Sequence, residues 1–434
     1  MHYKQQAALS ILLAIFLPNL ANSAPSKVTF EPIGPLIQSS QFPGERRSDN
    51  VSPHAASGCQ IANDRWILLF YTRGYRVVDE ERSVLYQIRE GKPDGKVLRE
   101  GMLAPSDAFG SPNQILIHGH AVVWGVPMGA QADGQPLPNA NHFCAKWYTK
   151  EVTVTPGNVR AKVHGMWVEW MQFKYDPECE DIRIVQPITK ANCGHTPLAG
   201  PVRLDPKGMT WVDLCSAHAP GANLEVVKAA SIQPVKYAWD SETGRYRITD
   251  KGSAWETGVP VFEGTMARAG KGWVSIARVR GGKGLVATHS DDPFSCAGNP
   301  RHLGQGTVGS MQKMVFRCAD GKLRVFSGVG GRSVAWSWEL DPKILSLSNQ
   351  TLVWNADKLD VPYEAGSGRV IDVYTLLPHA GGREQYLLYG FSPKALDYPY
   401  TGKLVGESAK DAAGVYYAKL IYPHDYPGEW QFGD

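Results

Sequence analysis

The chain has 434 residues, of which 43% are hydrophobic and 20% are charged, and its formal net charge is +3. The charge is weak and the basic residues are scattered, which excludes a protein that binds nucleic acid through a basic tail or stripe. The first element is the apolar run 7–17, which follows Lys4 and precedes the small residues 21–23. This order is typical of a secretory signal, and the run is too short to span a membrane. We therefore expect residues 1–23 to be a signal peptide, and the protein to be secreted or periplasmic without a membrane span.

The cysteines leave the disulfide pattern open. There are seven, Cys59, Cys144, Cys179, Cys193, Cys215, Cys296 and Cys318. Export permits disulfides, and the pairs nearest in sequence are Cys179–Cys193 and Cys296–Cys318. The odd number leaves at least one cysteine unpaired. No Cys-x-x-Cys spacing is present, so the sequence predicts no structural zinc site, and no cofactor is indicated.

A turn followed by an apolar strand recurs along the chain, and long helical periodicity is nearly absent. The segments are NDRWILLFY from residue 63, HGHAVVWG from 118, PKGMTWVDL from 206, GKGWVSIAR from 270, ADGKLRVFSG from 319 and GREQYLLYGF from 382. Their spacing of roughly 50 to 90 residues suits four short strands per repeat. We therefore expect residues 24–434 to form one all-β domain, a six-bladed β-propeller, with an inserted loop at 128–144. A β-sandwich with several similar hairpins is the alternative.

Charged residues follow or flank these segments. In the first repeat, Arg73, Arg76 and Asp79 come after the strand WILLFY. In the fourth, Glu263 and Arg278 bracket the turn and the strand. Because a propeller gathers one end of its inner strands around an axis, we expect these side chains to share a pocket although they lie far apart in sequence.

The later repeats add further candidates for this pocket. Arg332 follows a glycine-rich bend in the fifth repeat, and Tyr374 lies in the sixth, with Tyr363 as the fallback nucleophile. Three histidines start or precede strands near the axis, His118, His120 and His195. Of these, His195 is the favoured ligand-binding residue.

Taken in order along the chain, these segments resemble the sialidase (neuraminidase) superfamily. TRGYRVVDEE resembles the family's loop in which an Asp follows an arginine, and CGHTPLAGPVRLDPKGMTWVDL resembles its Gly-His segment. The spacing of Glu263 and Arg278 matches the family's Glu-to-Arg spacing. GQGTVGSM…LRVFSGVGGRSVAW resembles the segment ending in the third binding arginine, and VYTLLPHAGGREQYLLYG resembles the one carrying the nucleophilic tyrosine.

The resemblance implies a role for each matching residue. Asp79 would be the general acid/base, Tyr374 the nucleophile and Glu263 its base. Arg278 and Arg332 would bind an anionic group of the substrate, with Arg73 or Arg76 assisting near Asp79. The implied activity is that of a retaining exo-glycoside hydrolase acting on an acidic or neutral terminal sugar of a glycan, which departs from the usual two-carboxylate scheme.

The sequence departs from the family at His54. Sialidases hold a carboxylate with three arginines, whose planar guanidinium groups match its two oxygens. Where the first arginine is expected, this chain reads NVSPHAASGCQ, with His54 in its place. A histidine is a weaker, pH-dependent ligand for an anion. The family's Asp-boxes are also absent in recognisable form. We therefore expect weak activity, or none, on ordinary sialosides.

Two other functions fit the same residues. A polysaccharide lyase could use His54, Tyr374 and Arg278 to cleave uronate-containing glycans by β-elimination. A propeller that has lost catalysis could bind carbohydrate only. The sequence does not indicate the sugar, the linkage or the oligomeric state.

Overall fold

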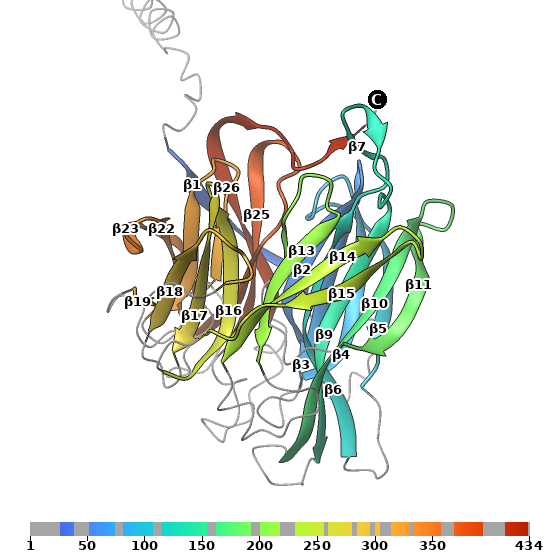
Figure 1. The fold of residues 1–434 in the computed structure, drawn as a ribbon, viewed down its shortest axis with the longest axis horizontal. Coiled ribbons are helices and arrows are strands. Elements are labelled where there is room, and N and C mark those ends of the chain that lie inside the picture. The colour runs from blue at the N-terminus through green and yellow to red at the C-terminus, as the bar shows by residue number, and fades with distance from the viewer. Residues whose placement is uncertain are drawn as a thin grey trace, which may run out of the picture.

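The computed structural model describes residues 27–38, 52–73, 81–106, 114–153, 162–191, 200–217, 231–255, 259–279, 284–295, 300–303, 314–329, 333–356, 369–393 and 413–432. The secondary-structure elements assigned within these residues, β1 to β27, are all β-strands. The strands form six four-stranded antiparallel sheets and one small three-stranded sheet. This confirms the six-bladed β-propeller expected from the sequence, and Figure 1 shows the strands running between a lower and an upper end.

The sheets are numbered along the chain, and each has one strand at the axis. The first sheet holds β2 (Ser52–Ala62), β3 (Arg65–Arg73), β4 (Glu81–Glu90) and β5 (Val97–Ala104). The second holds β6 (Gln114–Val126), β9 (His142–Thr153), β10 (Lys162–Asp176) and β11 (Asp181–Lys190). The third holds β12 (Val202–Arg203), β13 (Thr210–Ser216), β14 (Ile232–Asp240) and β15 (Arg245–Lys251).

The remaining sheets follow the same order, except that the last is closed by the other end of the chain. The fourth holds β16 (Val261–Ala269), β17 (Gly272–Val279), β18 (Leu285–Ser290) and β19 (Arg301–His302). The fifth holds β20 (Met314–Arg317), β21 (Leu323–Val329), β22 (Val334–Asp341) and β23 (Ser346–Asn355). The sixth holds β24 (Arg369–Leu376), β25 (Gly382–Pro393), β26 (Gly414–Tyr426) and β1 (Thr29–Gln38), and β1 pairs antiparallel with β26.

The first strand of each sheet faces the axis. Thus β2 contacts both β6 and β24, and β16 contacts β12 and β20. We call the end at which these strands begin the lower end, and the end at which they lead into the second strand the upper end (Figure 1). The insertion predicted at 128–144 leaves the second sheet at the upper end. There, β7 (Ala130–Ala132) and β8 (Gln135–Pro136) form a small sheet with β27 (Gln431–Phe432).

One assignment made from the sequence needs correction. The recurring apolar segments were expected to be inner strands, but five of the six are the second strands of their sheets, β3, β13, β17, β21 and β25. Only HGHAVVWG lies in a first strand, β6. The physical reason is burial, because a second strand packs on neighbouring sheets with both faces and therefore reads as a continuous apolar run.

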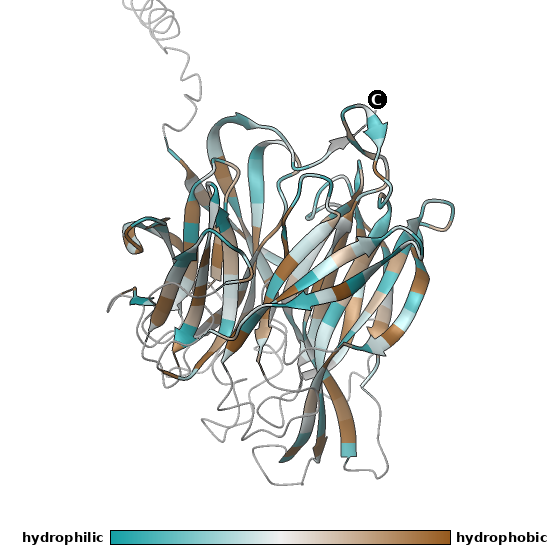
Figure 2. Cartoon of the chain, in the orientation of Figure 1, coloured by the Kyte–Doolittle hydropathy of each residue, from teal (hydrophilic) through white to brown (hydrophobic). Residues whose placement is uncertain are grey.

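The core lies between neighbouring sheets, and the second strands supply much of it. Trp66, Trp211 and Trp273 all lie in second strands and are buried. Figure 2 shows the brown apolar residues along the sheets and more teal at the upper turns and at the β7–β8 hairpin. Full burial of one large apolar side chain contributes about 1.5–3 kcal/mol.

Aspartates fix the upper turns that the sequence pattern predicted. Asp205 accepts hydrogen bonds from the backbone N–H groups of Lys207 (3.0 Å) and Thr210 (2.7 Å). In the fifth sheet, Asp320 precedes Gly321, whose φ of 77° favours glycine. Such Asp-centred turns satisfy backbone donors that the strands leave unpaired.

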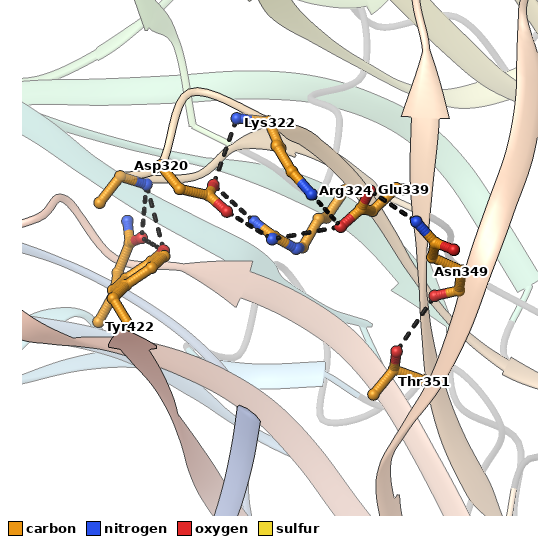
Figure 3. A network of polar contacts seen from close by, with 9 residues as sticks. Asp320, Lys322, Arg324, Glu339, Asn349, Thr351 and Tyr422 are labelled. Carbon is orange, nitrogen blue, oxygen red and sulfur yellow. Dashed lines mark hydrogen bonds and ion pairs between the residues drawn. The ribbon is translucent and has the colours of Figure 1, made fainter. Parts of the chain in front are cut away.

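A polar network locks the turn between β20 and β21 onto the sixth sheet (Figure 3). The backbone N–H of Ala319 donates to the Tyr422 hydroxyl at 3.1 Å and to Gln385 Oε1 at 3.2 Å. Asp320 accepts two hydrogen bonds from Arg324, at 2.7 and 2.6 Å. This bidentate geometry is the strong form of an ion pair, so the turn is held firmly.

A second buried ion pair joins the second and third sheets. Lys146 of β9 contacts the carboxylate of Asp213 of β13, and both side chains are almost fully buried. Lys146 also donates to the hydroxyl of Tyr237 at 3.2 Å and lies over the Trp124 ring. The charge of the lysine is therefore balanced inside the protein instead of by water.

Candidate functional site

Four first strands are irregular, β2 and β16 near their lower ends and β6 and β24 near their middles. Non-glycine residues with positive φ occur at His120 (49°) in β6, Glu263 (53°) in β16 and Val373 (51°) in β24. The strand pairing shifts register at each of these points, and in β2 it shifts next to His54. A bulge redirects a side chain, and such strained positions collect at functional sites. The lower end is therefore the candidate functional site.

Glu263 and Arg278 meet at this end of the fourth sheet. Arg278 Nη1 donates to Glu263 Oε2 at 2.9 Å, and their side chains are only 11% and 14% exposed. The guanidinium group also lies 4.7 Å from the ring centre of Phe262. The bulge at Glu263 turns the carboxylate toward the neighbouring strand, which places an oriented acid beside a largely buried cation.

Tyr374 lies one residue after the strained Val373 and is fully buried. Its ring is 6.3 Å from that of Tyr389, and both belong to a core cluster that includes Tyr71 and Tyr416. Burial is the main cause that raises the pKa of Tyr416 to about 12. The Glu263 carboxylate accepts a hydrogen bond from Arg278.

His54 begins a row of rings that crosses from the first sheet to the second. His54 is buried and lies 5.5 Å from Tyr71, its cross-strand partner in β3. Tyr71 lies 5.4 Å from His120, which lies 5.0 Å from Tyr148. The ammonium group of Lys150 sits 4.6 Å from the Tyr148 ring centre. Sequence reasoning missed Tyr71, Tyr148 and Lys150, although Tyr71 ends the apolar segment that it identified.

The other predicted site residues are placed as follows. Arg73 ends β3 at the lower end, and its side chain is not described. Four residues of the predicted site and the fallback tyrosine lie outside the described residues: Arg76, Asp79, His195, Arg332 and Tyr363. The structure thus brings Glu263 and Arg278 into contact, and it places His54 and Tyr374 on the adjacent strands β2 and β24. The roles assigned to these residues remain predictions.

The disulfides considered from the sequence do not form. Cys179 and Cys318, which each belong to one of the two pairs nearest in sequence, are free thiols. Cys179 is exposed, whereas Cys318 is buried in the core cluster. Burial raises the pKa of the Cys318 thiol to about 11, so it behaves as a small apolar residue.

A cavity of about 450 Å³ opens on the axis at the upper end, away from the predicted residues. All six sheets contribute to its walls, including Ser57, Trp124, Arg203, Arg268, Arg317 and His379. The strands β16 and β24 reach it through Met266 and Thr375, which follow Glu263 and Tyr374 in the chain. Because none of the predicted site residues lines it, this cavity is distinct from the lower end.

The described residues give no indication of a metal site or of a membrane-spanning helix. They contain no group of three or more His, Cys, Asp or Glu side chains arranged to hold a metal ion. Nor do they contain a helix with the length and apolar character needed to cross a membrane.

Sequence comparison identifies no relatives for this chain. No protein-family model matches it, and no curated protein sequence is significantly similar to it. The fold, by contrast, has many counterparts among solved structures.

A protein of unknown function from Dyadobacter fermentans matches with a TM-score of 0.57 at 8% identity, covering 92% of this chain and 100% of that one. A Trypanosoma rangeli sialidase in complex with 2,3-difluorosialic acid matches at 0.51 and 8% identity, covering 89% of this chain and 56% of that one. The Hadza microbial sialidase Hz136 matches at 0.50 and 9% identity, covering 85% of this chain and 65% of that one. The chain thus spans less than two thirds of these two sialidases, and it has a six-bladed β-propeller fold of the sialidase type.

Proposed function

We propose that this protein is an exo-acting glycoside hydrolase that uses sialidase-like chemistry on an acidic terminal sugar. The observation that carries the proposal is the pair of strained first strands at the lower end. One holds Glu263 against Arg278, and the other holds Tyr374. The Trypanosoma rangeli sialidase structure of similar fold contains a covalent intermediate, which supports a covalent route for proteins of this architecture.

In the proposed reaction, the Tyr374 oxygen attacks the anomeric carbon while Glu263 accepts the phenolic proton. Asp79 protonates the departing oxygen. Water then attacks the anomeric carbon with Asp79 acting as base, the bond to the tyrosine oxygen breaks, and that oxygen takes its proton back from Glu263. A tyrosine suits an acidic sugar because a neutral nucleophile is not repelled by the adjacent carboxylate. Tyr374 is fully buried in this structure, so the proposal requires substrate binding to uncover its hydroxyl.

Arg278 and Arg332 are proposed to bind the anionic group, with Arg73 or Arg76 near Asp79 and with His195 as a further contact. His54 replaces the arginine that would complete the triad. A neutral imidazole lacks the charged, forked hydrogen bonds of arginine, which are each worth about 1.5–3 kcal/mol. We therefore propose an acidic sugar other than the ordinary sialosides as substrate.

The test is a screen of the purified protein against sialosides, uronate polymers and neutral glycans, scored by release of reducing ends. Glu263→Gln is expected to lower kcat by about 10²–10⁴-fold, the usual range for a lost general base. Tyr374→Phe is expected to abolish turnover. Tyr389→Phe is the matched control, because Tyr389 is an equally buried tyrosine of the same core cluster.

Two outcomes would contradict this proposal. Turnover that survives Tyr374→Phe would remove the nucleophile. Efficient cleavage of a sialoside that also survives His54→Ala would mean that the anion is held by a complete set of arginines elsewhere.

The row of rings at His54 favours a second candidate, a polysaccharide lyase. A lyase needs a base and an acid near the uronate ring, and His54 and Tyr71 lie in contact at this end. β-Elimination leaves a double bond in the product, so ultraviolet absorbance rises, whereas hydrolysis produces no such signal. Tyr71→Phe should stop a lyase and leave the proposed hydrolase largely active.

A further inference from the structure

A second pocket, of about 610 Å³, lies at the upper end between the outer parts of the second and third sheets. Its cations are Lys174 of β10, Arg183 of β11 and Arg245 of β15. The rings of His142 and Trp239 form part of its wall. No aspartate or glutamate is among the described residues that line it.

The positions of these cations are unfavourable for stability. Lys174 and Arg183 are directly opposite each other in the antiparallel pairing of β10 and β11. Like charges in this arrangement destabilise a sheet. Lys174 and Arg183 form no ion pair among the described residues. An anion that binds between Lys174 and Arg183 would offset the repulsion between their charges.

Arg245, the third cation of the pocket, is also available to a ligand. Arg245 pairs in register with Asp240 of β14, but that carboxylate accepts a hydrogen bond from Thr243 at 2.9 Å and forms an ion pair with Arg247 at 2.8 Å. The nearest acid is therefore engaged by other donors. Arg245 is exposed at the pocket and is free to turn toward an incoming anion.

The environment of His142 shows that the same pocket disfavours a further positive charge. It is buried, its Nδ1 has no hydrogen-bond partner within the described structure, and its ring packs 4.6 Å from that of Trp239. Burial lowers the pKa of His142 to about 4, and the charge of Lys174 adds to this effect. The imidazole is thus kept neutral beside cations, and no carboxylate is among the described residues that line the pocket with them.

We infer that this pocket binds a sulfate or carboxylate group of an acidic polysaccharide, at a site separate from the lower end. The three cations supply the charge complementarity. Trp239 is only partly buried and lies at the wall, and an indole face suits the apolar face of a sugar ring. Because the pocket is on the surface, it can bind an internal segment of a long polymer, and no chain end is needed. The inference does not depend on the proposed hydrolase or lyase activity.

The experiment measures binding by calorimetry, with heparin as the sulfated polymer, polygalacturonate as the carboxylated polymer and dextran as the neutral one. We expect one or both acidic polymers to bind and dextran not to bind. The triple variant Lys174→Ala/Arg183→Ala/Arg245→Ala should weaken binding at least about tenfold, and added salt should weaken the binding of the wild type. Inorganic sulfate and phosphate serve as competitors that contain the anion alone.

The control removes the same charge from other upper turns, in Lys207→Ala/Lys271→Ala/Lys343→Ala, all of which are exposed lysines. This variant should bind nearly as well as the wild type. An equal loss in both triple variants would overturn the proposal, because it would mean that net charge alone drives binding. Equal affinity for dextran, or binding of the inorganic anions without binding of either acidic polymer, would also overturn it.

A single substitution separates a ligand site from an unused basic patch. Arg183→Glu places an acid opposite Lys174, so it should raise the melting temperature while it weakens binding of the acidic polymer at least about tenfold. A variant that is stabilised and binds as well as the wild type would show that the pocket is not the site.

Discussion

The first strands and the second strands of the sheets differ in regularity. The first strands β6, β16 and β24 each contain a non-glycine residue with positive φ, at His120, Glu263 and Val373. In the described second strands no non-glycine residue has positive φ, and these strands carry buried side chains along most of their length. The second strands thus supply much of the packing, which allows the first strands to hold strained residues around the axis.

The largest expected effect concerns the ion pair between two second strands. Asp213→Ala would leave Lys146 charged and buried without its carboxylate, beside Trp124 and Tyr237. Breaking one partner of a buried pair costs about 3–5 kcal/mol, so the free energy of unfolding should fall by that amount. Urea denaturation measures it.

The control for this prediction removes both charges. Lys146→Leu combined with Asp213→Leu should cost much less than Asp213→Ala alone, because no unpaired charge remains. A loss of under about 1 kcal/mol in the single variant would show that water reaches Lys146 and that the pair is not a stabilising part of the second strands.

The next effect is a loss of stability in mild acid, caused by His142 at the start of the second strand β9. Burial and the charge of Lys174 lower its folded pKa to about 4, whereas its ordinary value is 6.5. The unfolded chain therefore binds a proton more readily than the folded protein. The stability contribution is complete above pH 6.5 and declines as the pH falls toward 4, by about 3 kcal/mol in total.

This pH dependence can be assigned to His142 by substitution. In His142→Gln, the slope of unfolding free energy against pH between 4 and 6.5 should be smaller than in the wild type. An NMR titration should place the folded pKa of His142 near 4. A titration midpoint at the ordinary value would mean that the ring is hydrated in the folded protein.

The strain in the first strands can be measured against an equivalent valine in a second strand. Val373 of β24 and Val274 of β17 are both buried, but only Val373 has a positive φ. Glycine adopts this conformation freely, so Val373→Gly should cost about 1–3 kcal/mol less than Val274→Gly. Equal losses by thermal denaturation would mean that the first strand is not strained at this point.

The smallest effect is expected at an exposed ion pair, in the network of Figure 3. Lys322 bonds to Glu339 at 2.7 Å, but the lysine side chain is 53% exposed. Surface pairs of this kind contribute about 0–1 kcal/mol. Lys322→Ala should therefore barely change the melting temperature, whereas a shift as large as that of Asp213→Ala would contradict the ranking of these positions by burial.

The same contrast explains which features the sequence predicted. Strands such as β3 contain an uninterrupted apolar run after a polar turn, and the number and order of such segments predicted six sheets. First strands such as β12 are too short to give a pattern, and the bulge at Glu263 depends on packing against neighbouring sheets. The placement of Glu263 and Arg278 around one turn predicted that they would share a pocket, and they are in contact. The row of rings from His54 to Tyr148 and the basic pocket were not predicted, because each is formed by residues from different sheets.

The pairing of β1 with β26 has a consequence for how the protein is made. Thr29 pairs with Ile421, roughly 390 residues further along the chain, so the sixth sheet remains incomplete until nearly the whole chain has been synthesised. Until then, β1 has no partner, and an unpaired strand is a site for misassociation. Closure of the ring therefore requires two segments that lie roughly 390 residues apart in the chain. Shortening β1 should slow the gain of the native state and increase aggregation more than an equal deletion in an exposed turn.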